Sequence, residues 1–299
     1  MAAPQTMGVG IISAGKVGAA IGNALRAAGH QIIGAYATSP DSIDRLETML
    51  PGVPALDVPT IVERSELVLL AVPDDQLAPL VAGMAKLGAW QPGQIVVHTA
   101  GCYGTEVLAP AAAAGAICLA IHPAMTFTGT SLDVARLAGC PFAVTAPKTI
   151  QAIGLALVAQ LGGEGYLVSE ADRSLYHSAL SHGANHVVTV LGQARQALQA
   201  AGITDPGAYL RPLVQAAVEG ALSSGEALLT GPVSRADVGT VAAHVSALDT
   251  LREDLPADAD IFETYCYLAG VTADRAVRRR VITVQDANEI HEALRGKLN

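Results

Sequence analysis

Short apolar runs alternate with stretches of helical spacing through the first half of the chain. The apolar runs that predict strands lie at 7–13, 31–37, 67–72, 95–99, 117–122 and 142–145. Apolar residues at helical spacing predict helices at 15–28, 41–50 and 76–87. The run at 67–72 is apolar throughout, as in a strand that is covered on both faces. This alternation predicts an α/β domain whose doubly wound parallel sheet carries helices on both faces.

The pattern changes after Val168, and from Ala171 onward no run is typical of a strand. One long helix is predicted at 171–201, because Gly202 follows it as an end signal. Further helices are predicted at 212–222, 238–251, 260–269 and 285–294. We therefore expect two domains, an α/β domain over residues 1–168 and an all-helical (all-α) domain over residues 169–299.

Composition and charge limit the kinds of partner. The chain has 299 residues, of which 51% are hydrophobic and 15% charged, so it has the material for a large core. The net charge is −9, which repels phosphate backbones and anionic lipid, so neither nucleic acid nor a membrane surface is expected as a partner. No apolar run reaches 18 residues, and the four cysteines lack zinc or C-x-x-C spacing. We expect a cytoplasmic protein with reduced thiols.

The segment GIISAGKVG at 10–18 follows the first predicted strand and begins the first predicted helix. It matches G-x-G-x-x-G, with Ser13 in place of the first glycine. Gly15 allows the backbone to approach a pyrophosphate, and Gly18 allows the helix to pack closely on the strand. The free N–H groups at the helix start attract phosphate. A dinucleotide-binding Rossmann domain is therefore predicted, with a structural glycine turn as the alternative. Its predicted phosphate-binding residues are Ser13, Ala14, Gly15, Lys16, Val17 and Gly18.

The end of the second predicted strand bears on the choice of cofactor. An NAD site usually places Asp or Glu there to bind the ribose 2′-hydroxyl. This chain has Thr38 and Ser39 instead, whose hydroxyls can donate to a 2′-phosphate, so we expect NADP (NADPH). Asp41 lies close by, and no arginine stands at the strand end. The same two hydroxyl residues can also cap the helix that follows.

Three stretches resemble a known group of Rossmann-like oxidoreductases. LLAVPDD at 69–75 is similar to the fourth-strand signature of pyrroline-5-carboxylate reductase and the deazaflavin-dependent NADP oxidoreductases. HTAG at 98–101 and LAIHP at 119–123 resemble a narrower set, whose C-terminal helical part is a domain of unknown function. Tyr176, His177, Asn185 and LTGPVSRAD at 229–237 resemble that C-terminal part.

This resemblance implies an NADP-dependent reductase that acts on a small molecule. The wider group includes an alternative kind of ketopantoate reductase, so 2-dehydropantoate is one candidate substrate. The cofactor site is expected to include Val72, Pro73, Thr99 and Gly101. The chain departs from the family at Ala236, where glycine is usual, and at Cys102 and Tyr103, where residues are smaller.

Hydride transfer to a carbonyl or imine needs a proton donor, and the chain offers few. Its lysines are Lys16, Lys86, Lys148 and Lys297, so none lies on a helix of the second domain except at the chain end. This distinguishes the chain from lysine-dependent β-hydroxyacid dehydrogenases and conventional ketopantoate reductase. Histidine is the natural replacement, because its pKa lies near neutral pH. His122, at the end of a predicted strand, and His177, near the start of the long helix, are the predicted donors. His98 is a weaker candidate.

Asn185 and Arg235 are the predicted substrate-binding residues of the second domain. Asn185 lies on the long helix, two turns beyond His177, where it can orient a carboxylate or carbonyl. Arg235 lies in the turn-rich segment at 230–237 and can clamp a carboxylate with two hydrogen bonds. The structural alternatives are a hydrogen bond to a loop for His122, and an interdomain hydrogen-bond network for Tyr176 and His177. For Arg235 the alternative is a pairing with Asp237 or a helix-capping role.

Three further expectations concern metal, assembly and activity. His182 and His186 are spaced like zinc ligands, but the glutamate of H-E-x-x-H and a third ligand are missing, so no metal is expected. Helix faces rich in small residues, such as Ala216 and Ala217, predict a homodimer. A non-catalytic regulatory or scaffold protein that binds a dinucleotide is the rival interpretation, because the absent lysine suits a relative that has lost its chemistry.

Overall fold

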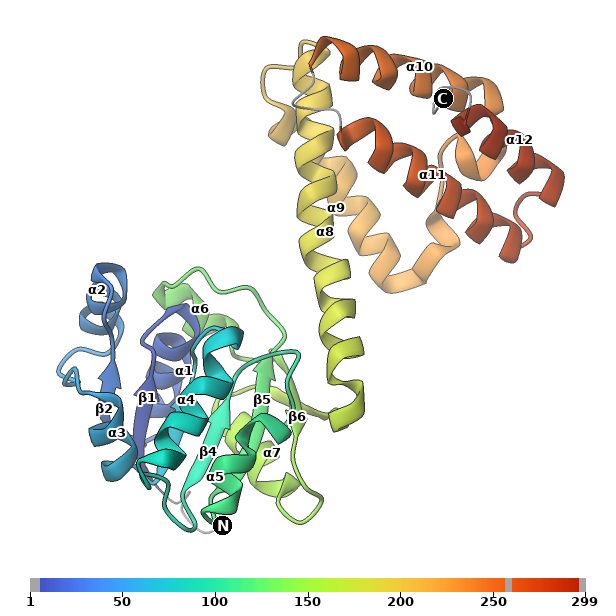
Figure 1. Cartoon of the computed structure of the whole chain (residues 1–299). Helices are drawn as coiled ribbons and strands as arrows, with labels where there is room; N and C mark the ends of the chain where they lie inside the picture. The colour runs from blue at the N-terminus through green and yellow to red at the C-terminus, as the bar shows by residue number, and fades with distance from the viewer. Residues whose placement is uncertain (1–5, 256–259, 296–299) are drawn as a thin grey trace. The chain divides into compact units, whose positions relative to one another are not determined.

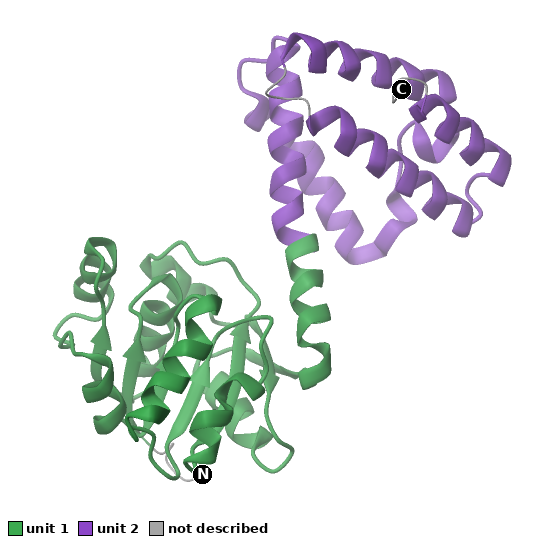
Figure 2. Ribbon diagram, viewed as in Figure 1, with its two compact units in different colours: residues 1–182 green, residues 183–299 purple. Residues whose placement is uncertain are grey.

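The computed structural model describes residues 6–255 and 260–295. Its residue contacts divide the chain into two compact units, Met1–His182 and Gly183–Asn299 (Figure 2). The first unit carries a mixed but mostly parallel sheet, and the second is built from helices (Figure 1). The α/β class and the all-helical character predicted for the two parts of the chain are thus confirmed.

Seven strands form the sheet of the first unit, in the order β2-β1-β3-β4-β5-β6-β7. Their bounds are β1 Gly8–Ile12, β2 Gln31–Tyr36, β3 Leu67–Leu70, β4 Ile95–His98, β5 Ile117–Pro123, β6 Pro141–Thr145 and β7 Glu164–Leu167. Neighbours pair in parallel except β5 and β6, which are antiparallel. Apolar periodicity marks a strand but not its direction, so the sequence pattern did not distinguish β6.

Helices cover both faces of this sheet, as the apolar pattern predicts. On one face, α1 (Lys16–Ala27) and α7 (Gln151–Gln160) share a core with alternate strand residues such as Leu69. On the other face, α3 (Val58–Arg64), α4 (Asp74–Lys86) and α5 (Ala109–Ala113) pack on the intervening positions such as Val68. Strand β3 is consequently buried along its whole length. Helices α2 (Pro40–Met49) and α6 (Ser131–Arg136) pack against α1.

Several elements of the first unit have weak local signals and were not predicted. Strand β7 lies at the sheet edge and all four of its residues are exposed, so it has no apolar run. Helix α7 carries apolar residues on every side and lacks a polar face. Helix α3 is only seven residues long, and is marked mainly by Asp57, which caps it.

The helices after residue 169 largely match the prediction. Their bounds are α8 Arg173–Ala200, α9 Pro206–Ser224, α10 Val238–Asp254, α11 Asp260–Arg278 and α12 Val284–Arg295. Helix α9 begins before the predicted start at Pro212, because Asp205 caps it by accepting from Ala208 N at 2.9 Å. Helix α11 continues past Gly270, because that glycine packs closely against His291 of α12. Three-residue 3₁₀ segments, η1 (Glu106–Leu108), η2 (Glu170–Asp172) and η4 (Val233–Arg235), connect elements.

The division between the two units lies inside α8, because the first residues of that helix pack on the sheet. Arg173, the first residue of α8, is buried and bonded to strands β5 and β6. The predicted boundary near Ser169 coincides with the change from strands to helices. As the limit between two domains, Ser169 stays a prediction. Among the described residues, no helix is both long and apolar enough to cross a membrane.

Candidate functional site

The carboxyl ends of strands β1 to β5 meet at one edge of the sheet. The register pairs Ile12 with both Tyr36 and Leu70, then Leu70 with His98, and His98 with Ala120. The segments that follow these residues therefore emerge at the same level. Strand β2 lies on one side of β1, and β3 lies on the other side, so the strand order reverses between β1 and β3. Open α/β sheets bind their ligands at such a point, beside the carboxyl ends of the strands.

The glycine turn after β1 has the geometry that its sequence predicts. Ser13 has φ 80°, a left-handed conformation that suits the glycine usual at this position. A Cβ on Gly18 would lie 2.1 Å from Ser13 O, so only glycine fits there. A Cβ on Gly15 would meet nothing closer than Ser13 Oγ at 3.3 Å, so the backbone is open to an approaching group. No side chain caps α1, and its first turn holds no acidic residue.

The remaining turn residues surround this opening. Ala14 is buried and its N–H donates to Tyr36 O at 2.8 Å, which ties the turn to β2. Lys16 is exposed at the start of α1, and Val17 packs on the core. These residues and the uncapped helix start fit the phosphates of a dinucleotide.

At the end of β2, Ser39 and Thr38 differ in their bonding. Ser39 Oγ accepts from Ser42 N at 3.2 Å, and Ser42 Oγ accepts from Ser39 N at 3.0 Å, so Ser39 caps α2. Thr38 is exposed, and its hydroxyl has no hydrogen bond within the described part of the chain. The acidic residue nearest in sequence, Asp41, is exposed in the first turn of α2.

His98 holds the loop after β4 as a neutral side chain. Its Nδ1 accepts from Ala100 N at 3.2 Å, and its Nε2 donates to Gly104 O at 2.7 Å. Burial lowers the His98 pKa to about 4. With both ring nitrogens occupied and the side chain fully buried, His98 has a structural role.

The predicted donors His122 and His177 come together over Gly101. A Cβ on Gly101 would lie 2.5 Å from His177 Cδ2 and 3.0 Å from His122 Nε2, so no side chain fits there. The centres of the two imidazole rings are 5.9 Å apart, and the ring planes are nearly perpendicular. Thr99 and Gly101 follow β4, and Val72 and Pro73 follow β3, so these predicted cofactor residues share the edge with His122.

Tyr176 joins this group through His122. Its hydroxyl lies 2.9 Å from His122 Nδ1, and the two rings meet edge to face. Burial, followed by the charges of His177 and Arg173, lowers the His122 pKa to about 4. Burial also raises the pKa of the Tyr176 phenol. At neutral pH, His122 is therefore an uncharged ring beside a protonated phenol.

Arg173 is the residue of this site that sequence reasoning missed. Its Nε donates to Thr145 Oγ1 at 2.7 Å, and its Nη2 donates to Ala120 O at 2.8 Å and Ala143 O at 3.2 Å. Nη1 is buried without a hydrogen-bond partner among the described residues. The guanidinium lies 5.9 Å from the centre of the Tyr176 ring. An arginine among polar residues at a helix start gives no local signal of such burial.

The neighbouring loop is tied down by Glu170. Its carboxylate accepts from Thr105 N at 2.7 Å, Thr105 Oγ1 at 3.1 Å and Glu106 N at 3.2 Å. Cys102, in the same loop, donates its thiol to Asp74 at 3.1 Å, and burial raises its pKa to about 11. Cys102 is therefore a protonated thiol at neutral pH.

Asn185 and Arg235 belong to the second unit, where both are exposed. Asp237 caps α10 by accepting from Thr240 N at 3.0 Å. Arg235 has no ion pair in the described ranges, which leaves its guanidinium available. Their participation in one site with His122 stays a prediction.

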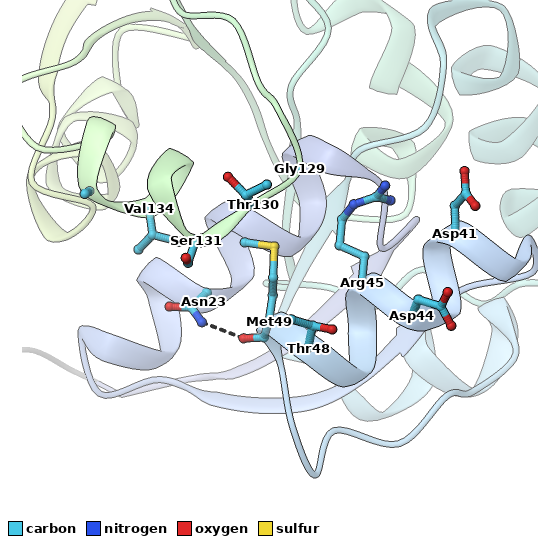
Figure 3. A pocket seen from close by; sticks show the side chains of 11 residues that line it. Asn23, Asp41, Asp44, Arg45, Thr48, Met49, Gly129, Thr130, Ser131 and Val134 are labelled. Atoms are coloured by element: carbon cyan, nitrogen blue, oxygen red, sulfur yellow. Dashed lines mark hydrogen bonds between the residues drawn. The ribbon is translucent and has the colours of Figure 1, made fainter.

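An open groove of about 790 Å³ is lined by Gly129 and by residues of three helices (Figure 3). It runs between α1, α2 and the segment that begins α6. Its polar lining includes Asn23, Asp41, Asp44, Arg45 and Thr130. Within residues 6–255 and 260–295, no three His, Cys, Asp or Glu side chains gather as metal ligands.

Comparisons with known protein families agree with this architecture. Residues 2–123 match the Rossmann-like domain, and residues 140–271 match a domain of unknown function, DUF2520. The chain combines these two domains. The resemblance that the sequence motifs indicate is thereby confirmed, whereas no curated protein matches the chain.

Solved structures share the fold over almost the whole chain. BF3122 from Bacteroides fragilis, named as a candidate NADP oxidoreductase, is 19% identical with a TM-score of 0.71, covering 96% of this chain and 98% of its own. An imine reductase from Streptomyces aurantiacus is 15% identical with a TM-score of 0.63, covering 95% and 99%. A reductive aminase from Aspergillus terreus, solved with NADPH and ethyl levulinate, is 17% identical with a TM-score of 0.61, covering 96% and 99%. At these identities the likeness establishes the fold.

Proposed function

We propose that this chain is an NADP-dependent oxidoreductase that reduces a small carboxylate-bearing keto or imino substrate. The observation that carries the proposal is the convergence of His122, His177 and Tyr176 on Gly101, at the same sheet edge as an open phosphate turn. The names of fold relatives support this class, since they include an imine reductase and a reductive aminase solved with NADPH.

The residues present fit a nicotinamide dinucleotide. The pyrophosphate would bind the open backbone at Gly15 and the uncapped start of α1. The absence of a carboxylate at the end of β2 favours NADPH over NADH, because a carboxylate would repel a 2′-phosphate. When bound, NADPH supplies the hydride.

The proton would pass through His122. Because this ring is neutral at pH 7, its Nδ1 accepts from the Tyr176 hydroxyl and its Nε2 carries the hydrogen. Nε2 faces Gly101, where a substrate heteroatom would receive its proton while the phenol proton moves to Nδ1. The resulting tyrosinate lies near the Arg173 cation and regains a proton from water. His177, whose ring reaches the same glycine, is the alternative donor.

The second unit would contribute substrate binding and assembly. Arg235 would bind the substrate carboxylate, and Asn185 would orient the reacting carbonyl or imine. We also propose a homodimer, in which a second copy covers apolar side chains that are exposed on α8 and α9.

Activity is tested by following NADPH oxidation with a panel of 2-keto acids and cyclic imines, 2-dehydropantoate among them. We expect turnover with at least one of these compounds. His122→Ala and Tyr176→Phe should each lower kcat by about 10²–10⁴-fold, the range of general acid catalysis, with unchanged NADPH affinity. NADPH binding without turnover on the panel would favour the regulatory or scaffold interpretation. Near-normal kcat in both variants would leave His177 as the donor.

A further inference from the structure

Two cationic side chains that are far apart in sequence meet at Gly129. A Cβ on this glycine would lie 2.9 Å from Arg45 Nε and 3.0 Å from Lys16 Cγ. Lys16 begins α1 at the glycine turn, whereas Arg45 lies on α2, the helix that follows β2. The segment before α6 thus contacts the Arg45 guanidinium of one helix and the side-chain stem of Lys16 on the other.

The wall formed by Gly129 is rigid. Asp133 is fully buried and accepts from Gly129 N at 2.6 Å, Thr128 N at 3.1 Å and Thr128 Oγ1 at 2.9 Å. These hydrogen bonds hold the pKa of its carboxyl below the ordinary value against the opposing effect of burial. Gly129 itself has φ 87°, which a larger residue rarely adopts. The segment is therefore preorganised, and leaves space for the Arg45 guanidinium.

Neither cation is neutralised by a neighbouring carboxylate. In the described ranges, no Asp or Glu oxygen lies within 4.0 Å of a Lys16 or Arg45 nitrogen. Asp41 and Asp44 are exposed on the same helix as Arg45 and line the same groove, but Arg45 extends between Asp41 and the Gly129 segment (Figure 3). Helical side chains lean toward the helix N-terminus, which places this guanidinium toward the start of α2 and hence the end of β2.

We propose that Arg45, together with Lys16 across Gly129, binds the phosphate monoester that distinguishes NADP from NAD. This assignment rests on the proposed function, because it concerns the cofactor of that same site. The glycine turn would account for the two phosphates of the single pyrophosphate, and the ribose 2′ position of a bound dinucleotide would lie at the end of β2. A guanidinium there supplies the paired donors that suit a phosphate dianion. Arg45 is thus a specificity-determining residue that local sequence did not reveal.

The test is calorimetric titration of the full chain with NADPH, NADH, 2′,5′-ADP and 5′-AMP. Arg45→Ala is expected to lower the affinity for NADPH and 2′,5′-ADP by about 10-fold or more. Its affinity for NADH and 5′-AMP should stay within about twofold of wild type. Arg45→Lys should retain part of the preference, because it keeps the charge but loses the paired donors. Arg136→Ala, on adjacent α6, is the matched control and should bind all four ligands as wild type does. A thermal melt of each variant confirms folding.

The outcomes separate this inference from the proposed function. If Arg45→Ala weakens the binding of NADPH and NADH equally, or of neither, Arg45 does not bind the 2′-phosphate, while the proposal of dinucleotide binding stands. If the wild-type chain binds NADH more tightly than NADPH and Asp41→Ala removes that binding, Asp41 is the ribose ligand and the assignment of Arg45 is wrong. If wild type binds none of the four ligands, the proposed function itself fails.

Discussion

Ala236 adopts a left-handed backbone conformation, with φ 56° and ψ 33°, at the point where the resembling family has glycine. For an L-residue this conformation costs roughly 1–2 kcal/mol, and replacement by glycine removes that cost. Part of the gain is lost because glycine makes the unfolded chain more flexible and so stabilises the unfolded state. Ala236→Gly is therefore expected to raise the free energy of unfolding by about 0.5–1 kcal/mol.

Ala156→Gly is the matched control, because Ala156 is exposed in the middle of α7. This identical change should lower the free energy of unfolding by about 0.5–1 kcal/mol, since glycine weakens a helix interior. Both shifts are measured by calorimetric melting. The same sign for the two variants would show that Ala236 is not strained.

His98 links folding stability to pH. Its pKa is about 4 in the folded chain and about 6.5 when unfolded, so only the unfolded form takes up a proton between these values. Stability is expected to be at its full value above pH 6.5 and to fall by about 1.4 kcal/mol per pH unit toward pH 4 for this one group. His122, with a similar pKa, adds to the slope.

Urea titrations at pH 7, 6, 5 and 4 measure this dependence. His98→Asn removes one of the two titrating rings and should roughly halve the slope that they contribute, at the cost of lower stability at pH 7. A variant with the wild-type slope would mean that His98 is not held neutral by its two loop bonds.

At the scale of elements, Arg173 joins the first turn of α8 to the antiparallel pair β5–β6. Arg173→Ala would remove the hydrogen bonds that Ala120 O and Ala143 O accept from this buried guanidinium, so we expect a loss of about 3–5 kcal/mol of stability. Hydrogen exchange should also accelerate in the first turn of α8, including the amides of Tyr176 and His177.

Arg136→Ala is the contrasting change, because Arg136 is an exposed arginine whose ion pair with Asp133 is long, at 3.9 Å. Its effect should stay within about 1 kcal/mol. Equal effects of the two substitutions would contradict an anchoring role for Arg173.

At the scale of the whole molecule, the second unit exposes many large apolar side chains. Leu222 is 82% exposed and Val218 43%, one turn apart on α9, and Gly183 and Gly192 on α8 have open space beside them. A homodimer would cover such residues. Val218→Glu with Leu222→Glu is therefore expected to produce a monomer at micromolar concentration by sedimentation, because two buried carboxylates would oppose association.

Leu87→Glu is the control, since Leu87 is 66% exposed at the end of α4 in the first unit. This variant should sediment as wild type does. A wild-type chain that sediments only as a monomer would exclude the dimer.

Local sequence determined much of this protein. The continuous apolar run of β3 predicted burial on both faces, and Gly15 and Gly18 in their strand–turn–helix context predicted the open turn. Helical spacing after residue 169 predicted the all-helical unit. These features depend on neighbouring residues, whose periodicity and backbone preferences act over a few positions of the chain.

Tertiary structure alone decided which side chains meet. Arg173 bonds to Ala120 and Thr145, Tyr176 bonds to His122, and Arg45 meets Lys16 at Gly129, all across long stretches of chain. The exposed edge strand β7 and the reversed direction of β6 were equally invisible to periodicity. Each of these features is set by sheet register and by the docking of helices, which bring residues together through the packing of the whole unit rather than through their own local pattern.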